Sequence, residues 1–246
     1  AAQRATPLPR IARSCVRGRS RARAASRTMH ASAGTPILAP GIGRVVALGA
    51  SNLTRGFPAV VSAVRAAWGP GTEVLAALGH GRSYGAPSRL LVRTLPGILE
   101  CGLWRALESL PEAPTRALVT DVGNDIMYGY PAERILAWVE ETLRRLRRVT
   151  QDITLTGLPL ASIGGLSAWR YLAVRTILFP SCRLPLARAL EAAEHVSAGL
   201  AGLAGRHGAR LVRLDPAWYG LDPIHIRPAL ARITWKYSIN PNRSRC

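Results

Sequence analysis

The sequence predicts an α/β fold in which helices cover both faces of a five-stranded parallel sheet, giving a three-layer α/β/α sandwich. Short apolar runs of strand length alternate with longer segments of helical periodicity, and this alternation is typical of parallel sheets. Of the 246 residues, 48% are hydrophobic, which is enough for a core in one domain with extensions or in two small domains. No uninterrupted apolar stretch reaches the roughly 18 residues of a membrane-spanning helix, so we expect no transmembrane segment.

Five apolar runs are the expected strands, and the segments between them are the expected crossovers. The strands are predicted at residues 44–49, 73–78, 116–120, 152–156 and 209–214. Helices are predicted at 54–68, in pieces over 87–110, from Pro131 onward, and from Leu186 to Gly205 or Gly208. The helix after Pro131 places apolar residues on one face and basic residues in its last turn, where they complement the helix dipole: Ile135, Val139, Leu143 and Leu146, then Arg144, Arg145, Arg147 and Arg148.

The net charge of +19 comes from 33 Lys and Arg against 14 Asp and Glu, and much of it lies at the ends of the chain. Residues 1–35 contain arginines, no acid and no apolar periodicity, so we expect a disordered arm. This arm resembles an organellar transit peptide or a nucleic-acid-binding arm, whereas a true start at Met29 would make it non-native. Residues 236–246 are expected to be a polar tail, which leaves a folded domain over 36–235.

The four cysteines stand far apart and form no C-x-x-C pair: Cys15, Cys101, Cys182 and Cys246. We therefore expect neither a zinc site nor a disulfide framework, and a reducing compartment fits this pattern. The N-terminal segment lacks the apolar core of a secretory signal. A cytoplasmic location follows as the expectation, with a transit peptide in residues 1–28 left open.

Polar and glycine-rich groups follow four of the expected strands. They are Gly49-Ala50-Ser51-Asn52, the glycine-rich loop 79–85, Asp121-Val122-Gly123-Asn124-Asp125 and Asp222-Pro223-Ile224-His225. Right-handed crossovers bring the carboxyl ends of parallel strands to one edge of the sheet, which is where such folds bind ligands. The four groups are therefore expected to meet.

The chemistry of these groups is complementary. A serine becomes nucleophilic at neutral pH only beside a base, and His225 is the candidate base for Ser51. Asp222, three residues earlier on a proline-stiffened turn, would fix the tautomer of His225. The oxyanion of a tetrahedral intermediate needs donors, for which we expect the Ser51 N–H, a glycine N–H after the second strand and the Asn124 amide.

In this order the four groups resemble the sequence blocks of the SGNH hydrolases, also called GDSL-type esterases and lipases. The resemblance spans residues 44–228 and rests on Gly49-x-Ser51, Gly79, Gly123-Asn124-Asp125 and Asp222-x-x-His225. It implies the flavodoxin-like SGNH hydrolase fold and ester hydrolysis through an acyl-enzyme, with no metal and no organic cofactor. The implied substrate is a small-molecule, carbohydrate or lipid ester, and the sequence identifies neither its acyl group nor its alcohol.

Two features depart from the family pattern or leave it open. Ala50 stands where the family usually has an aspartate that helps to hold the nucleophile turn. Gly79 and Gly81 both fit the glycine of the second block, and the distance from the strand end favours Gly79. The other common serine-hydrolase elbow, Gly-x-Ser-x-Gly, is absent because Leu53 occupies the position of its second glycine.

Structural roles compete with these catalytic ones. Ser51 also fits a helix N-cap, and Asn124 and Asp125 fit a turn and a cap. Asp215 ends the fifth strand in a similar context and rivals Asp222 as the partner of His225.

Three further residues are candidates for the wall of the substrate pocket, namely His80, Asp125 and Trp218. A metal site made of His80, Asp121 and His225 is conceivable, but no ligand spacing supports it.

Two other functions use the same features. The basic arm and surface arginines fit a protein that binds nucleic acid or an anionic surface and has an inactive hydrolase-like core. An acyltransferase would use the same serine. Because 11 of the 19 net positive charges lie outside the predicted domain, we expect no specific nucleic-acid partner, and the sequence predicts no oligomeric state.

Overall fold

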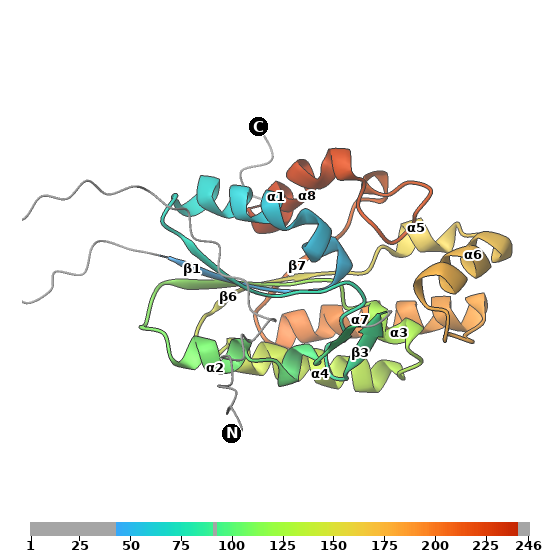
Figure 1. The fold of residues 1–246 in the computed structure, drawn as a ribbon, viewed down its shortest axis with the longest axis horizontal. Helices are drawn as coiled ribbons and strands as arrows, with labels where there is room; N and C mark the ends of the chain where they lie inside the picture. Colours follow the sequence, from blue (N-terminus) through green and yellow to red (C-terminus); the bar gives the residue numbers. More distant parts are fainter. Residues whose placement is uncertain (1–42, 91–92, 241–246) are drawn as a thin grey trace, which may run out of the picture.

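A parallel sheet of five strands forms the centre of the molecule (Figure 1). The computed structural model describes residues 43–90 and 93–240. The strand order is β2-β1-β5-β6-β7, with every neighbouring pair parallel. These strands are β1 (Arg44–Leu48), β2 (Glu73–Ala77), β5 (Thr115–Val119), β6 (Asp152–Thr156) and β7 (Arg210–Val212). All five predicted strands are present, although the last is shorter than the predicted 209–214.

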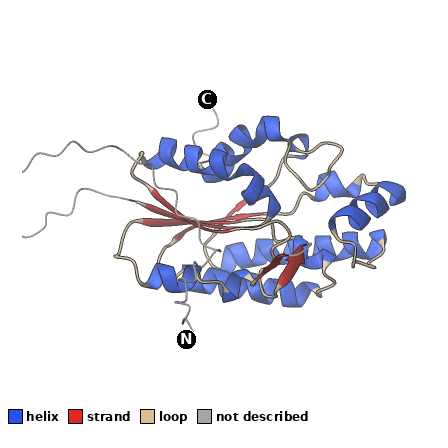
Figure 2. Ribbon diagram, viewed as in Figure 1, coloured by secondary structure: helices blue, strands red, loops and turns tan. Residues whose placement is uncertain are grey.

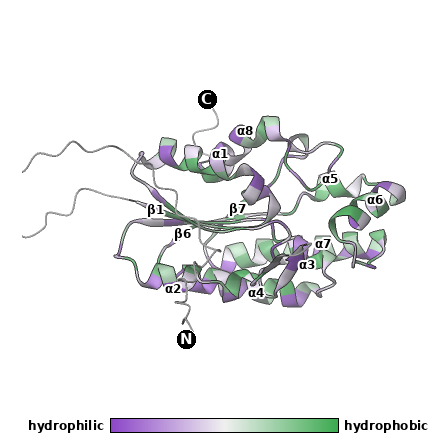
Figure 3. Cartoon of the chain, viewed as in Figure 1, coloured by the Kyte–Doolittle hydropathy of each residue, from purple (hydrophilic) through white to green (hydrophobic). Residues whose placement is uncertain are grey.

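Helices cover both faces of the sheet, as predicted (Figure 2). One face is covered by α1 (Ser51–Trp68) and α8 (Ala231–Ile239). The other face is covered by α2 (Leu103–Glu108), α4 (Ala132–Leu146) and α7 (Leu186–Arg206). Apolar strand residues lie between these layers, and Figure 3 shows the polar sides of the helices turned outward. The three-layer α/β/α fold class is confirmed.

Helix α4 shows how the sequence pattern selects its buried face. Ile135, Val139, Leu143 and Leu146 are fully buried at helical spacing, as the periodicity predicts. The helix ends at Leu146, so only Arg144 and Arg145 lie in its last turn, and both form ion pairs with Glu141. The placement of Arg147 and Arg148 in that turn was therefore wrong.

The region 87–110 corrects a second prediction. Its first half is a short antiparallel hairpin of β3 (Ser88–Leu90) and β4 (Arg93–Leu95), separate from the main sheet. The 3-10 helix η1 (Ile98–Glu100) and α2 follow. Pro87 and Pro96 flank the hairpin, and proline lacks the N–H that a helix interior needs. Only the second half of the region is helical.

The predicted polar tail also begins too early. Helix α8 continues to Ile239 and packs against α1, with Trp235, Ser238 and Ile239 buried. Gly56 of α1 makes this contact close, because a Cβ at that position would overlap the indole nitrogen of Trp235. The boundary at residue 236 is thus wrong. The predicted arm at 1–35 and the end of the tail at 241–246 lie outside the described residues.

Several short helices were not predicted and shape the carboxyl edge of the sheet. They are α3 (Asn124–Met127), α5 (Leu160–Gly164), α6 (Ala168–Leu178), η2 (Pro216–Trp218) and η3 (Pro228–Leu230). Helices α5 and α6 lie at one end of the molecule, beside the end of α7 (Figure 1).

Cys101 and Cys182 are free and buried. None of the helices in the described part of the chain is long and apolar enough to span a membrane.

Candidate active site

Ser51 is the first residue of α1 and follows β1 after a two-residue turn. Its side chain is largely buried, and the residue that caps the helix is Ala50, which makes no side-chain capping bond. The alternative that Ser51 is a helix N-cap is therefore wrong.

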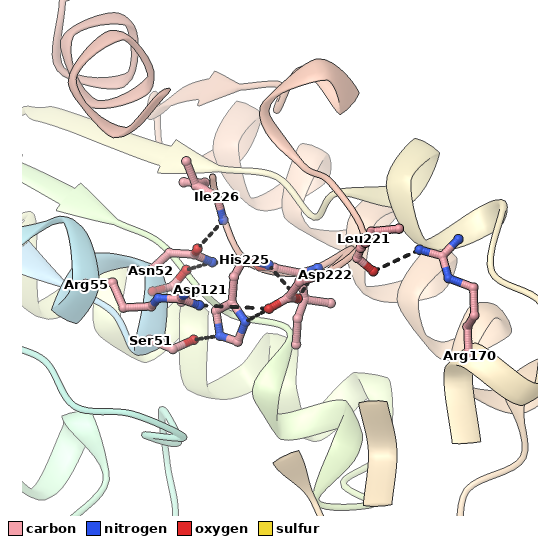
Figure 4. A network of polar contacts seen from close by, with 10 residues as sticks. Ser51, Asn52, Arg55, Asp121, Arg170, Leu221, Asp222, His225 and Ile226 are labelled. Atoms are coloured by element: carbon pink, nitrogen blue, oxygen red, sulfur yellow. Dashed lines mark hydrogen bonds and ion pairs between the residues drawn. The ribbon is translucent and has the colours of Figure 1, made fainter. Parts of the chain in front are cut away.

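Ser51, His225 and Asp222 form a continuous hydrogen-bonded chain (Figure 4). The Ser51 Oγ lies 2.9 Å from His225 Nε2, and His225 Nδ1 lies 2.6 Å from Asp222 Oδ2. The turn predicted from the Asp-x-x-His spacing holds this geometry, because Asp222 Oδ1 accepts the backbone N–H groups of Ile224 and His225 at 3.2 Å each. The structure brings together the three residues predicted from the sequence.

The surroundings favour the ionised form of Asp222. Burial raises the pKa of this half-buried carboxyl, but the hydrogen bonds and charge of His225 and two backbone N–H groups outweigh burial and lower it. Arg55 on α1 lies 3.9 Å from the same carboxylate. The rival Asp215 instead caps η2 by accepting the N–H of Ala217.

A second carboxylate, Asp121, holds the turn that carries Ser51. Its Oδ2 accepts the N–H groups of Ala50 and Leu53 at 2.9 and 3.0 Å, and its Oδ1 accepts Asn52 Nδ2 at 3.0 Å. Asp121 directly precedes the Val122-Gly123 turn and has a φ of 61°, a left-handed conformation that is uncommon outside glycine.

Asn52 extends this network to the loop of His225. Its Nδ2 also donates to the carbonyl of Ile224 at 2.9 Å, and its Oδ1 accepts the N–H of Ile226 at 2.8 Å. Figure 4 shows Asn52 lying between Asp121 and the backbone beside His225. Sequence reasoning did not identify Asn52, and it assigned Asp121 no role in holding the turn that carries Ser51.

Asn124 is the first residue of α3, which Gly123 caps. Its amide lies 3.5 Å from the carbonyl of Arg82 in the loop after β2, and its side chain shares a cavity wall with Ser51. The Gly81 carbonyl in the same loop accepts the hydroxyl of Tyr128. The part of the loop beside Asn124 and α3 is thus Gly81-Arg82, whereas a Cβ at Gly79 would meet Leu95 of β4.

Two of the three predicted pocket residues have structural roles instead. Asp125 is fully buried, and its Oδ2 accepts the N–H of Tyr84 at 2.9 Å, which anchors the loop after β2. Burial raises the pKa of Asp125 to about 6, against the opposing hydrogen bonds of Ser83 and Tyr84. Trp218 packs edge-to-face on Tyr237 of α8, with ring centroids 5.6 Å apart, as is usual for such pairs. Neither side chain lines the cavity beside Ser51.

His80 is exposed in the loop after β2 and also lies outside that cavity wall. Its pKa is lowered by partial burial and by the nearby charges of His225 and Arg55. His80 therefore belongs to the surroundings of His225. The conceivable metal set of His80, Asp121 and His225 is not assembled, and no group of three or more His, Cys, Asp or Glu within 43–90 and 93–240 is placed to hold a metal.

A largely apolar cavity of about 120 Å³ opens beside Ser51. Ser51, Asn52, Asp121 and Asn124 form the polar part of its wall. The rest comes mainly from the β6–α5 loop and from α5, α6 and α7. This apolar wall was missed, because the helices that supply it were not predicted from the sequence.

The sequence matches no protein-family model and no curated protein. Solved structures nevertheless share the fold. A carbohydrate acetylesterase family member from Sinorhizobium meliloti is 15% identical, with 80% of this chain and 96% of that chain covered and a TM-score of 0.54. TesA is 16% identical, with 82% and 99% covered and a TM-score of 0.51. A member of the lipolytic protein G-D-S-L family from Veillonella parvula DSM 2008 is 10% identical, with 83% and 100% covered and a TM-score of 0.50.

These similarities establish the architecture. The chain has the α/β/α fold of the SGNH, or GDSL-type, hydrolases, as its sequence predicts.

Proposed function

We propose that this protein is a serine ester hydrolase in which Ser51 is the nucleophile, His225 the general base and acid, and Asp222 the residue that orients His225. The observation that carries the proposal is the hydrogen-bonded chain from Ser51 Oγ through His225 to Asp222, at 2.9 and 2.6 Å. These distances lie within the range at which a base takes a proton from a nucleophile.

The first half of the reaction forms an acyl-enzyme. His225 Nε2 takes the proton of Ser51 Oγ as the oxygen bonds to the ester carbonyl carbon, and the carbonyl oxygen becomes an oxyanion. The intermediate then collapses, the bond to the alcohol oxygen breaks, and His225 returns the proton to the departing alcohol. Ionised Asp222 stabilises the imidazolium between these events.

The second half regenerates the enzyme. His225 takes a proton from water as the water oxygen bonds to the acyl carbon, and it returns that proton to Ser51 Oγ as the acid leaves. An acyltransferase would differ only in the acceptor at this step, and no contact of the described residues favours an alcohol over water.

Three donors are proposed for the oxyanion. The Ser51 N–H is in the first turn of α1, where N–H groups have no acceptor within the helix. The Asn124 Nδ2 is the second donor, since its side chain borders the same cavity. As the third donor we propose the Gly81 N–H in place of the Gly79 N–H, because the Gly81-Arg82 part of the loop lies next to Asn124 and α3.

Substitution of Ser51 tests the proposal. Wild-type protein is expected to hydrolyse p-nitrophenyl butanoate, and Ser51→Ala to reduce kcat by on the order of 10⁴-fold or more. Ser109→Ala, at an exposed serine that ends α2, is the matched control and is expected to keep full activity. Hydrolysis by Ser51→Ala at the wild-type rate would overturn the proposal.

A further inference from the structure

The cavity beside Ser51 is built for an apolar group. Apart from Asp121, no charged residue lines it, and the Asp121 carboxylate is occupied by Ala50, Asn52 and Leu53. Tyr171 of α6 also presents its ring, because its hydroxyl donates to the Leu184 carbonyl at 2.7 Å. A polar or charged ligand group would lose its hydration in this space and find few partners.

The position of His225 decides which half of an ester fits this cavity. His225 must reach the departing alcohol oxygen to return its proton, so the alcohol lies on the side of His225. Pro223 and Ile224 just before His225 line the cavity but the His225 ring does not, whereas Ser51 and the proposed oxyanion donor Asn124 both do. The cavity therefore extends from the nucleophile on the acyl side.

We propose that this cavity binds the acyl chain of the ester and selects acyl groups of intermediate length. The proposal rests on the proposed function, since it names the substrate of the same serine. A cavity of about 150 Å³ lined by Leu, Ile and Phe holds benzene, which has six carbons. The present cavity of about 120 Å³ thus fits roughly four to six carbons.

Hydrolysis of two ester series is the main test. With p-nitrophenol as the constant alcohol, kcat/KM is expected to rise about fourfold for each methylene added from acetyl toward hexanoyl, because each buried methylene contributes about that factor. It is expected to fall again for dodecanoyl. Acetate esters with alcohols of increasing length are expected to vary less than threefold. Equal rates for acetyl and hexanoyl esters, or a steep dependence on the alcohol, would overturn the proposal.

Substitutions in α7 locate the effect. Ala189 is buried in the cavity wall, so Ala189→Phe is expected to lower the ratio of kcat/KM for the hexanoyl ester to that for the acetyl ester at least tenfold. Ala187→Phe, on the exposed side of the same helix, is the matched control. Leu190→Ala removes part of the wall and enlarges the cavity. The acyl length with the highest kcat/KM is therefore expected to increase. An unchanged chain-length profile in both cavity variants contradicts the assignment.

Binding without turnover separates this proposal from the proposed function. Ser51→Ala is expected to bind methyl hexanoate at least tenfold more tightly than methyl acetate in an NMR titration, and Ala189→Phe is expected to remove the difference. Binding without any hydrolysis by the wild type would leave the cavity assignment standing and overturn the proposed function. Hydrolysis that depends on Ser51 but has no preference for acyl length would support the proposed function and overturn the cavity assignment.

A different observation carries a second proposal. The network of Asp121 and Asn52 joins the backbone on both sides of the triad: Ala50 and Leu53 around the nucleophile, and Ile224 and Ile226 around His225. We infer that Asp121 and Asn52 are positioning residues that set the distance between Ser51 Oγ and His225 Nε2. Asp121 thereby supplies, from the end of β5, the carboxylate that is missing at Ala50.

Asp121→Asn tests this inference with little change to the backbone, because asparagine tolerates the left-handed conformation as well as aspartate does. The amide introduced at position 121 has one N–H₂ group, which would face N–H donors in either orientation: those of Ala50 and Leu53, or that of Asn52. We expect kcat to fall on the order of 100-fold, the cost of a small misplacement of reacting groups, with KM within twofold. Asp152→Asn, at a half-exposed carboxylate paired with Arg116, is the control.

Asn52→Ala provides the second arm and leaves the contacts of Asp121 to Ala50 and Leu53 in place. It removes the contacts of Asn52 with Asp121 and with the backbone on both sides of His225, so kcat is expected to fall at least tenfold while KM and the melting temperature change little. A purely structural role would lower the melting temperature and leave kcat of the folded protein intact, and that result in either variant would overturn the inference.

Discussion

Two carboxylates in the loops around Ser51 have pKa values that depart from the usual range in opposite directions. Asp222 is half-buried, and the contacts with His225 and its own turn lower its pKa in spite of burial. Asp125 is fully buried among the residues of the loop after β2, and burial raises its pKa to about 6. The first environment suits a permanent anion beside an imidazolium, whereas the second suits an anchor for backbone N–H groups.

Asn124 is the residue whose proposed role has the most specific kinetic signature. An oxyanion donor acts mainly in the transition state, so Asn124→Ala is expected to lower kcat on the order of 100-fold with little change in KM. Gln151→Ala, which removes an exposed amide, is the control. The measurement is steady-state hydrolysis of p-nitrophenyl butanoate, and a variant with full kcat would rule out the role.

The sequence predicted that Ser51, His225 and Asp222 come together because the signals for them are local. Asp222 and His225 share one turn, and Ser51 directly follows a strand whose apolar run is unmistakable. Asn52 and Asp121 were missed in their positioning role because their contacts join segments about seventy and more than a hundred and seventy residues apart, and only the folded loops bring them together. The sequence favours Gly79 over Gly81 by its distance from the strand end, whereas the folded loop places Gly81-Arg82 beside Asn124 and α3, so the donor from this loop stays a proposal.

At the scale of elements, the contact between α1 and α8 supports one face of the sheet. Gly56 allows it, because the indole of Trp235 occupies the space where any larger residue would place its Cβ. Trp235 is fully buried beneath this contact. Helix α1 also carries Ser51 at its first position, so this packing holds the helix that presents the proposed nucleophile.

Gly56→Ala is therefore expected to lower the free energy of unfolding by about 1–3 kcal/mol, the usual cost of overpacking a filled core. Gly205→Ala near the end of α7 is the matched control, because a Cβ there meets no other atom. Alanine is the better helix former, so the control is expected to be unchanged or slightly more stable. Urea unfolding followed by circular dichroism measures both, and equal stability of the two variants would contradict this packing.

The helices and strands that were not predicted from the sequence are those whose apolar residues show no clear periodicity. Helix α6 buries only Tyr171 of its own residues and exposes Trp169 and Ile177, so its pattern lacks the usual apolar stripe. The hairpin of β3 and β4 has three residues in each strand, too few for alternation to be read. The five sheet strands and α4 were predicted because their apolar residues face a continuous core.

At the scale of the whole molecule, the parallel sheet gathers loops from most of the chain at its carboxyl edge. Segments that begin at Ser51, Gly79, Asp121 and Asp222 follow different elements and meet there. The same edge couples the global stability to pH, because the buried Asp125 lies there in the first turn of α3. A carboxyl whose pKa is higher in the folded state than in the unfolded chain costs free energy when it is ionised in the folded state. Its ionisation therefore lowers the free energy of unfolding.

The direction of this dependence follows from the raised pKa of Asp125. The folded state holds the proton more tightly than the unfolded chain, so stability decreases as pH rises from about 4 to about 6, by on the order of 3 kcal/mol. Asp125→Asn is expected to flatten the curve in this window. Denaturant unfolding across the pH range measures the difference, and parallel curves for the two proteins would contradict the placement of Asp125. Glu140, Glu141 and His80 also have lowered pKa values, but they are common to both proteins and cancel from the difference.

The most direct test of the central claim is covalent labelling of Ser51. A fluorophosphonate loses fluoride when an activated serine attacks its phosphorus, and the adduct remains on that serine. Peptide mass spectrometry is expected to place one equivalent on Ser51, with none on Ser51→Ala and a much slower reaction in His225→Ala. Stoichiometric labelling of another residue, or equal labelling of Ser51 without His225, would contradict the account.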